Sequence, residues 1–229
     1  MISIIIPTLN EEQCIGKLLS FLKNHNQREE FEVIVVDGAS QDNTATICNS
    51  FSIRIIKSAE TSRAHQMNEG AKLAKGEIFY FVHADAIPPK SFVDDIFNTT
   101  SSGYESGCYR FEFLNKPTPL LYINDFCTRF PFKWCRGGDQ TLFISRKLFD
   151  QLGGFNEKFV IMEDYEMLDR IMDLSTFKVM PKPVLVSSRK YSHNSYMKVQ
   201  LTNLKAMRMY RKGVEPAQIK QFYQSQLNS

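Results

Sequence analysis

Short apolar runs alternate with longer, mostly polar stretches through the first hundred residues. Three of the runs, at residues 2–6, 33–36 and 78–82, lack polar alternation and are rich in β-branched or aromatic side chains. Such runs are typical of strands buried on both faces, as in parallel sheets. The stretches between them predict crossover helices at residues 11–26, 42–49 and 62–75. The pattern therefore predicts a doubly wound, mostly parallel α/β sheet flanked by helices.

The second half of the chain has a less regular pattern. It predicts strands near residues 106–113, 140–145 and 178–186, helices near 146–152 and 164–174, and two tail helices, one at 194–212 and one opened by Pro216. The length of 229 residues suits one well-packed α/β domain. We therefore expect a single domain with a helical C-terminal extension.

Charge is distributed unevenly between this extension and the rest of the chain. Residues 174–214 contain nine Lys or Arg side chains and no acidic one, whereas the net charge of the whole chain is +3. A basic tail on an acidic body indicates an anionic partner, either a phosphate group or a membrane surface. The alternative is that the tail is a solvated helix face whose apolar residues pack on the body. Nucleic-acid binding is disfavoured because the body is acidic and no recognised binding module occurs.

The cysteines and the apolar runs bear on location. Five cysteines, an odd number without a CxxC pair, suggest neither a disulfide framework nor a zinc site and fit a reducing compartment. No apolar run approaches the roughly 18 residues that cross a bilayer. We therefore expect a cytoplasmic protein, with the basic tail as a potential contact to the inner membrane face.

Each of the three predicted strands is followed by polar residues, at 7–11, 37–40 and 83–85. The carboxyl ends of parallel strands share one edge of the sheet, where ligands bind. One such group of residues would be weak evidence, because Asp, Asn and Gly also form ordinary turns and helix caps. Neither a GxGxxG nor a GxxxxGK[ST] motif is present, so phosphates must be held differently. A carboxylate such as Asp85 suits Mg²⁺ or Mn²⁺ bridging a diphosphate.

The order and spacing of these motifs over residues 2–170 resemble the family 2 glycosyltransferases, which have the GT-A fold. Pro7-Thr8-Leu9-Asn10-Glu11 is similar to the opening segment of that family, and Asp37 to its uracil- or ribose-binding acid. His83-Ala84-Asp85 occupies the position of the family's metal-binding DXD motif, with His in place of the first Asp. The resemblance thus implies that Asp85 is the metal ligand.

Further segments extend the resemblance. Residues 63–70 are similar to a segment that lines the nucleotide-sugar pocket, residues 137–140 to one near the acceptor, and residues 153–157 to a Gly-Gly-Phe turn before the catalytic acid. The implied donor-binding residues are Pro7, Thr8, Asn10, Glu11, Asp37, Arg63, Gln66 and Asp85. On the acceptor side the implied residues are Asp139 and Glu163. Arg189, Lys190 and His193 are candidates to close over the leaving diphosphate.

The catalytic acid is expected within residues 162–165, where Glu163 and Asp164 are adjacent. Asp164, Leu168 and Ile171 share one helix face, which we expect to be buried, whereas Glu163 falls on a polar face. We therefore assign Asp164 as the general base, with Glu163 as a neighbour that supports it or is solvated. The resemblance implies inversion by a single displacement, in which Asp164 takes a proton from an acceptor hydroxyl.

Together these residues predict a metal-assisted inverting glycosyltransferase that uses a nucleotide diphosphate sugar. Uridine is the commoner base in the family, so a UDP-linked donor is expected; the acceptor is a lipid, a glycan or a small molecule. The expected halves are a nucleotide-binding part at 1–100 and an acceptor and catalytic part at 101–180, followed by the tail at 181–229. The alternatives are a sugar-phosphate nucleotidyltransferase, which normally has a Gly-rich loop after its first strand, and a non-catalytic module that binds sugar nucleotides or membrane surfaces.

Overall fold

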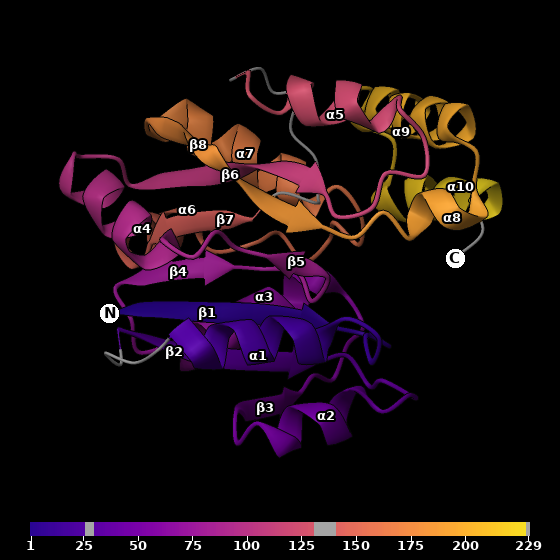
Figure 1. Ribbon diagram of the computed structural model, residues 1–229. Helices are drawn as coiled ribbons and strands as arrows, with labels where there is room; N and C mark the ends of the chain where they lie inside the picture. The colour runs from indigo at the N-terminus through magenta and orange to yellow at the C-terminus, as the bar shows by residue number, and fades with distance from the viewer. Residues whose placement is uncertain (26–29, 131–140, 228–229) are drawn as a thin grey trace.

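The computed structural model describes residues 1–25, 30–130 and 141–227. Within these ranges the chain forms one eight-stranded sheet in the order β3-β2-β1-β4-β7-β6-β8-β5 (Figure 1). The strands are β1 (Ile2–Thr8), β2 (Phe31–Asp37), β3 (Arg54–Lys57), β4 (Ile78–Phe81), β5 (Ala86–Ile87), β6 (Ser106–Phe113), β7 (Leu142–Ser145) and β8 (Phe177–Val186). The helices are α1 (Ile15–His25), α2 (Thr44–Ser50), α3 (Arg63–Leu73), α4 (Phe92–Ser101), α5 (Leu121–Cys127), α6 (Arg146–Leu152), α7 (Glu163–Leu174), α8 (Lys190–His193), α9 (Tyr196–Arg211) and α10 (Pro216–Gln226).

The first half follows the predicted parallel arrangement. Strands β3, β2, β1 and β4 run parallel, and every residue of β1 is buried. Strand β3 escaped prediction because it has only four residues with an exposed charge at each end, Arg54 and Lys57. The register of β1 and β2 places Thr8 opposite Asp37 at their carboxyl ends.

The second half is mixed. Strand β7 pairs antiparallel with both β4 and β6, and β5 pairs antiparallel with β8, while β6 and β8 are parallel. The antiparallel pairings in the described ranges therefore all involve the second half or the short β5. The predicted strand at 106–113 and helix at 146–152 coincide with β6 and α6.

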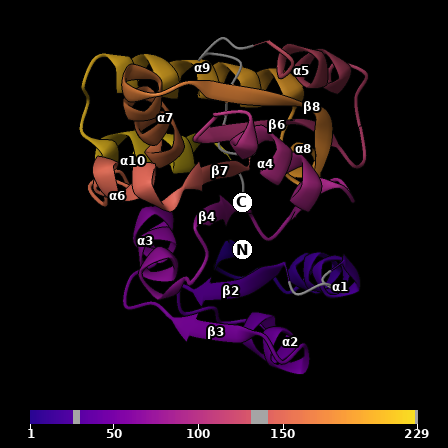
Figure 2. The same ribbon diagram turned by 90° about the vertical axis from the view of Figure 1, so that its left-hand side faces the viewer.

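Helices cover both faces of the sheet and complete two hydrophobic clusters. Side chains of α1 and α4, such as Leu18 and Phe92, pack with Ile4 and Ile6 on one face. On the other face, α3, α6 and α7 pack against Ile5 and its neighbours. Figure 2 shows these two helical layers on opposite sides of the sheet. The mixed α/β sheet with helices on both faces confirms the predicted fold class.

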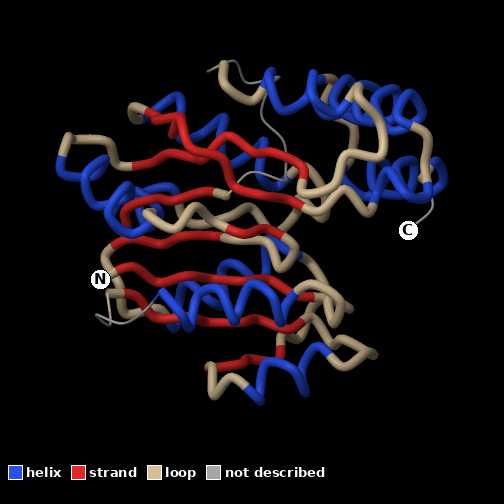
Figure 3. The backbone as a smooth tube through the Cα atoms, viewed as in Figure 1, coloured by secondary structure: helices blue, strands red, loops and turns tan. Residues whose placement is uncertain are grey.

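The C-terminal extension packs on the second half as α8, α9 and α10. It is tied there by Tyr196 Oη, which donates to Asn124 Oδ1 at 2.9 Å, and by Tyr210 Oη, which donates to Asp169 Oδ2 at 2.8 Å. Among the described residues, we find no helix both apolar and long enough to cross a membrane. The loops that follow β1, β2 and β4 gather at one end of the sheet (Figure 3), where β8 also ends.

Candidate active site

The carboxyl ends of β1 and β2 are joined by a buried hydrogen-bond network around Asp37. Thr8 Oγ1 and Ser40 Oγ donate to Asp37 Oδ1 at 3.2 and 2.5 Å, and the Ser40 backbone N–H donates to Asp37 Oδ2 at 3.0 Å. Asp37 is only 3% exposed, so these donors compensate the cost of burying its charge. The carboxylate is consequently fixed in one orientation.

The loop after β1 is held by side chains of the loop after β2. The backbone N–H groups of Asn10, Glu11 and Glu12 donate to the side-chain oxygens of Ser40, Thr44 and Asp42 respectively. Asn10 adopts a left-handed conformation with φ of 57°. The predicted helix at 11–26 therefore begins later, at Ile15, because these N–H groups are engaged across the two loops.

A cleft of about 480 Å³, the main cleft, lies at these carboxyl ends. Six of the eight predicted donor-binding residues line it: Pro7, Thr8, Glu11, Arg63, Gln66 and Asp85. Asp37 lies behind Thr8 and Asn10 lies in the adjoining loop, and neither is among the residues lining the cleft. Gln66 is buried, and its Nε2 donates to the Thr8 carbonyl at 3.3 Å, which connects α3 to β1.

The tail contributes one wall of the main cleft. Of the three candidates to close over the diphosphate, Arg189 and Lys190 line the cleft, whereas His193 is exposed and does not. Lys220, Tyr223 and Gln224 of α10 also line it, and sequence reasoning missed them. Lys190 Nζ contacts Tyr223 Oη and lies 4.8 Å from the centre of that ring. Only the general excess of cations in the tail signalled a role for these residues.

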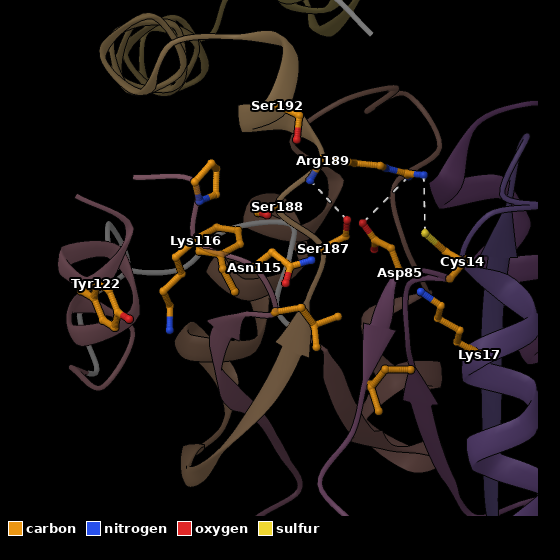
Figure 4. A pocket seen from close by; sticks show the side chains of 15 residues that line it. Cys14, Lys17, Asp85, Asn115, Lys116, Tyr122, Ser187, Ser188, Arg189 and Ser192 are labelled. Carbon is orange, nitrogen blue, oxygen red and sulfur yellow. Dashed lines mark hydrogen bonds and ion pairs between the residues drawn. The ribbon is translucent and has the colours of Figure 1, made fainter. Parts of the chain in front are cut away.

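Arg189 bridges two predicted donor-site carboxylates. Its Nη1 and Nη2 lie 2.7 and 2.5 Å from the two carboxylate oxygens of Glu11. Nη2 also lies 3.9 Å from Asp85 Oδ2, as Figure 4 shows. Hydrogen bonding to Glu11, with the charge of Asp85 nearby, raises the pKa of the guanidinium further above its ordinary value. The cation thus holds the loop after β8 against the loops after β1 and β4.

A second cavity, the side cavity, lies on the other side of this ionic bridge. Its volume is about 650 Å³, and it shares Asp85 and Arg189 with the main cleft. From there it extends past Ser187 to Lys116 and Tyr122 (Figure 4). Sequence reasoning singled out Asp85 and Arg189 but gave no signal for the end of this cavity near Tyr122, because α5 was not predicted.

The prediction of which face of α7 is buried was wrong. Glu163, Met167 and Ile171 are the buried residues, and Asp164 and Leu168 are only partly buried. Met167 and Ile171 belong to the apolar cluster beneath α7. Because Met167 packs there instead of Leu168, the buried face of the helix is displaced by about one residue from the predicted face. Glu163 is therefore buried rather than solvated.

Glu163 is neutralised by Arg63. Arg63 Nε lies 2.8 Å from Glu163 Oε1, with the arginine side chain 46% exposed and the glutamate side chain 1% exposed. Within the described ranges, neither Glu163 oxygen accepts a well-directed hydrogen bond. The contact joins α3 to the start of α7 next to the main cleft, which Arg63 and Ile161 both line. Asp164 is the next residue on this helix, and Asp139 lies outside the described residues.

The glycine turn before α7 is fixed by Asn68, a residue that sequence reasoning did not single out. Asn68 Oδ1 accepts from the Phe155 N–H at 2.8 Å, and Nδ2 donates to the Phe155 carbonyl and to Glu157 Oε1. Gly154 has φ of 76°, and a Cβ there would lie 2.7 Å from Asn68 Oδ1. The turn therefore requires glycine, and it sets the path of the chain toward Asp164.

Asp85 fits a diphosphate-bridged divalent ion. Its side chain is 26% exposed and faces both cavities, so its oxygens are accessible. Within the described residues, no three His, Cys, Asp or Glu side chains converge to form a metal site. Mg²⁺ commonly takes only one or two carboxylates and completes its shell with substrate phosphates and water. Asp85 meets that requirement, with Glu11 close by on the same arginine.

Solved structures with this fold contain nucleotides. This chain is similar to S. aureus TarS 1-349, with a TM-score of 0.67 and 19% identity. The alignment covers 97% of this chain and 69% of the other. A mannosyltransferase from Pyrobaculum calidifontis in complex with GDP-Man and Mn²⁺ gives a TM-score of 0.68 at 19% identity, covering 97% of this chain and 67% of the other. At these identities the similarity establishes the GT-A-like fold alone.

Curated relatives share higher sequence identity with this chain over shorter stretches. The dolichyl N-acetyl-alpha-D-glucosaminyl phosphate 3-beta-D-2,3-diacetamido-2,3-dideoxy-beta-D-glucuronosyltransferase of Methanococcus voltae is 34% identical over 106 residues, which are 43% of this chain and 33% of that protein. The probable glycosyltransferase YdaM of Bacillus subtilis is 28% identical over 203 residues, 76% of this chain and 47% of its own length. The chain thus spans a third to about half of these two relatives.

The family profile named Glycosyl transferase family 2 matches residues 3–122, more than half of the chain. The matched region includes β1, β2 and β4 with the polar residues at their carboxyl ends, and it ends within α5. The predicted family is confirmed: this chain belongs to the glycosyl transferase family 2.

Proposed function

We propose that the chain is an inverting glycosyltransferase that moves a sugar from a UDP-linked donor to an acceptor hydroxyl with the help of Mg²⁺ or Mn²⁺. The observation that supports it most is the main cleft, which is lined by six of the predicted donor-binding residues, Asp85 and Arg63 among them, and by Arg189. Solved relatives in complex with UDP, with UDP-GlcNAc, and with GDP-Man and Mn²⁺ support this class of donor.

In this proposal the nucleotide lies over the ends of β1 and β2. The Thr8 hydroxyl and the Gln66 amide border the cleft and offer polar contacts to a base or ribose. Asp37 is included as a donor-site residue: its carboxylate, oriented by Thr8 and Ser40, would accept a further hydrogen bond from a hydroxyl or N–H group of the nucleotide. The diphosphate then extends toward Asp85 and the two arginines.

The chemical step uses groups on both halves of the chain. A divalent ion on Asp85 would neutralise charge on the departing diphosphate. Arg189 and Lys190 lie where they can add positive charge to the same group. Asp164 takes the acceptor proton as the hydroxyl attacks the anomeric carbon, and Glu163, held by Arg63, positions the start of its helix. Asp139 is assigned to the acceptor side.

We further propose that residues 1–229 work as one domain located at the cytoplasmic face of the membrane. The exposed lysines of α9 support peripheral membrane contact through the tail. Two relatives are named for dolichyl or dolichol phosphates, one from Methanococcus voltae and one from Pyrococcus furiosus, which makes a lipid-borne acceptor a reasonable candidate.

The experiment that tests the proposal is a donor-hydrolysis assay over a panel of nucleotide sugars, comparing the wild type with Asp164→Asn. Because water can replace the acceptor, slow release of UDP can be measured without identifying the acceptor. The proposal expects metal-stimulated release that falls in the variant, and NMR of the released sugar should give inverted anomeric configuration. A wild type that binds donors without releasing nucleotide would instead identify a binding module.

A further inference from the structure

Helix α5 presents apolar side chains to solvent. Tyr122, Ile123 and Phe126 are 63%, 55% and 54% exposed, while Leu121 and Asp125 are turned inward and buried. The rings of Phe126 and Phe130 meet edge to face at 5.5 Å, so the exposed group continues past the end of the helix. The outward side of this short helix is therefore its more apolar side.

Over its first three turns, helix α9 also exposes apolar side chains to solvent. Met197, Leu201 and Leu204 follow a spacing of four and three residues, so they share one helix face, and they are 58%, 59% and 48% exposed. The buried face holds Val199, Thr202 and Ala206, which are small or medium-sized. An apolar stripe of this kind normally faces the protein core rather than water.

The two helices lie beside each other at the end of the second half remote from α2 and β3. The hydrogen bond from Tyr196 to Asn124 joins the start of α9 to α5, and Figures 1 and 2 both show the pair along one edge of the molecule. We call their exposed apolar residues the α5–α9 face: Leu120, Tyr122, Ile123, Phe126, Phe130, Met197, Leu201 and Leu204. Grouped apolar exposure of this kind marks an interaction surface, whereas scattered residues do not.

The charged side chains of α9 are all positive. On α9, Lys198, Lys205 and Lys212 flank the apolar stripe on one side and Arg208 continues it, all of them exposed. The single acid of α5, Asp125, is buried and paired with Lys116 at 2.9 Å. Residues 174–214 contain no acid. Apolar and aromatic side chains bordered by lysines are the composition of helices that lie in the interface of anionic bilayers.

The face also adjoins the proposed active site. The side cavity begins at Tyr122 and Lys116, beside α5, and ends at Asp85 and Arg189. A molecule anchored in a bilayer under the α5–α9 face would thus have a polar passage to the edge where the sugar is transferred. Lys17 and Ser187 line that passage and suit an anionic head group.

We propose that the α5–α9 face docks on an anionic lipid bilayer and that the side cavity admits the head group of a membrane-borne acceptor; the second clause rests on the proposed transferase function. The bilayer is preferred over a second copy of the chain because two copies would bring the same excess of lysines together. Self-association is nevertheless a distinct outcome of the test.

Co-sedimentation of the full chain with vesicles tests the docking surface. We expect binding to phosphatidylglycerol-containing vesicles, weak binding to pure phosphatidylcholine, and weakening by salt. Ile123→Ser combined with Phe126→Ser, and separately Leu201→Ser, should each lower the affinity roughly tenfold or more, since each removes insertable apolar area. Lys198→Gln with Lys205→Gln should weaken binding to anionic vesicles alone. The matched control is Leu73→Ser, an exposed leucine in the first half, which should leave binding unchanged.

Circular dichroism and UDP titration of each variant verify that the fold and the donor site are intact. Failure of the wild type to bind vesicles, or equal binding by the Ile123/Phe126 variant and the wild type, would overturn the proposal. A dimer in sedimentation equilibrium that Leu201→Ser dissociates would overturn it in favour of self-association. Vesicle binding by a chain that binds no nucleotide would leave the docking surface standing and remove only the acceptor clause.

Discussion

The carboxyl ends of β1 and β2 and the carboxyl end of β4 belong to one sheet edge, but they are held by different forces. Around Asp37, buried hydrogen bonds from Thr8 and Ser40 fix the carboxylate, and no ion pair to it is found among the residues that the structure describes. Around Asp85, the neutralising group is the tail residue Arg189, which also pairs with Glu11. The first region is thus preformed, whereas the second depends on an ion pair that is shared with the tail.

This difference predicts distinct behaviour on ligand binding. A nucleotide can occupy the preformed region with little rearrangement of the backbone. A diphosphate and a divalent ion at Asp85 must compete with Arg189, so the loop after β8 is expected to move and to bring its arginine onto the phosphates. The two regions then correspond to recognition of the donor and to chemistry.

The largest expected effect is on chemistry alone. Asp164→Asn should lower the rate of transfer or donor hydrolysis by about 10²–10⁴, the usual contribution of a general base, and leave UDP affinity unchanged. Single-turnover kinetics together with UDP titration measure the two quantities. Asp173→Asn makes the same change at an exposed position of the same helix and should have no effect. Full activity of Asp164→Asn would remove it from the mechanism.

Loss of the cation next to Glu163 should be felt in stability. Arg63→Met leaves a buried carboxylate without its partner and should lower the free energy of unfolding by about 1–3 kcal/mol, less than for a fully buried pair because Arg63 is 46% exposed. Urea denaturation at neutral pH measures this. Adding Glu163→Gln should restore part of the loss, and an additive double variant would contradict the pairing.

In the preformed region around Asp37, a smaller loss of stability is expected, together with a loss of donor affinity. Ser40→Ala removes one short hydrogen bond to Asp37 and should cost about 1–2 kcal/mol of stability. UDP affinity should fall along with it, because the Asp37 carboxylate loses its fixed orientation. Ser50→Ala, on the outer surface of α2, is the matched control. Unchanged stability and affinity would show that the Asp37 network is not preformed.

The smallest effect concerns His65, which pairs with Glu157 at 3.0 Å. The hydrogen bond to Glu157 raises the pKa of His65 above its ordinary 6.5, and hydrogen bonds from Asn68 and His65 lower the pKa of Glu157 below its ordinary 4.5. The pair therefore stabilises the fold between about these two values. Its contribution is lost as pH rises through the folded pKa of His65 or falls through that of Glu157.

Urea denaturation at pH 5.5 and pH 8 measures this contribution. The wild type should lose somewhat more stability than His65→Gln between the two pH values, by less than about 1 kcal/mol because the pair is partly exposed. His193→Gln replaces an exposed histidine of α8 and should match the wild type. If the free energy of unfolding changes equally with pH in the wild type and in His65→Gln, the pair does not contribute to stability.

The sequence predicted the first half of the chain better than the second, for a physical reason. Strands β1 and β4 are fully buried and β2 is buried from Ile34 onward, so their apolar runs are unmistakable, and their polar ends meet through simple parallel pairing. Short elements such as β3 and α5 carry little periodic signal. The helix face of α7 was misassigned because Met167 and Leu168 are similar in hydrophobicity, and only packing against Phe149 and Phe155 decides between them.

Contacts between distant segments were beyond prediction for a different reason. Arg189 and Glu11 are 178 residues apart, and neither flanking pattern encodes the partner. Asn68 likewise contacts a distant segment, at Phe155 and Glu157. Its role was not predicted, although residues 63–70 were assigned to the nucleotide-sugar pocket. The roles of the predicted site residues, including Asp139 outside the described ranges, stay predictions.

Calorimetric titration with UDP and with GDP, each with and without Mn²⁺, on the wild type and on Asp85→Ala, tests the central claim most directly. The account predicts Mn²⁺-dependent binding of UDP by the wild type and its loss in the variant. Binding of GDP instead of UDP would revise the assigned base of the donor but would still support the assigned site. If neither nucleotide binds under any condition, the assignment of the sheet edge as a donor site is contradicted.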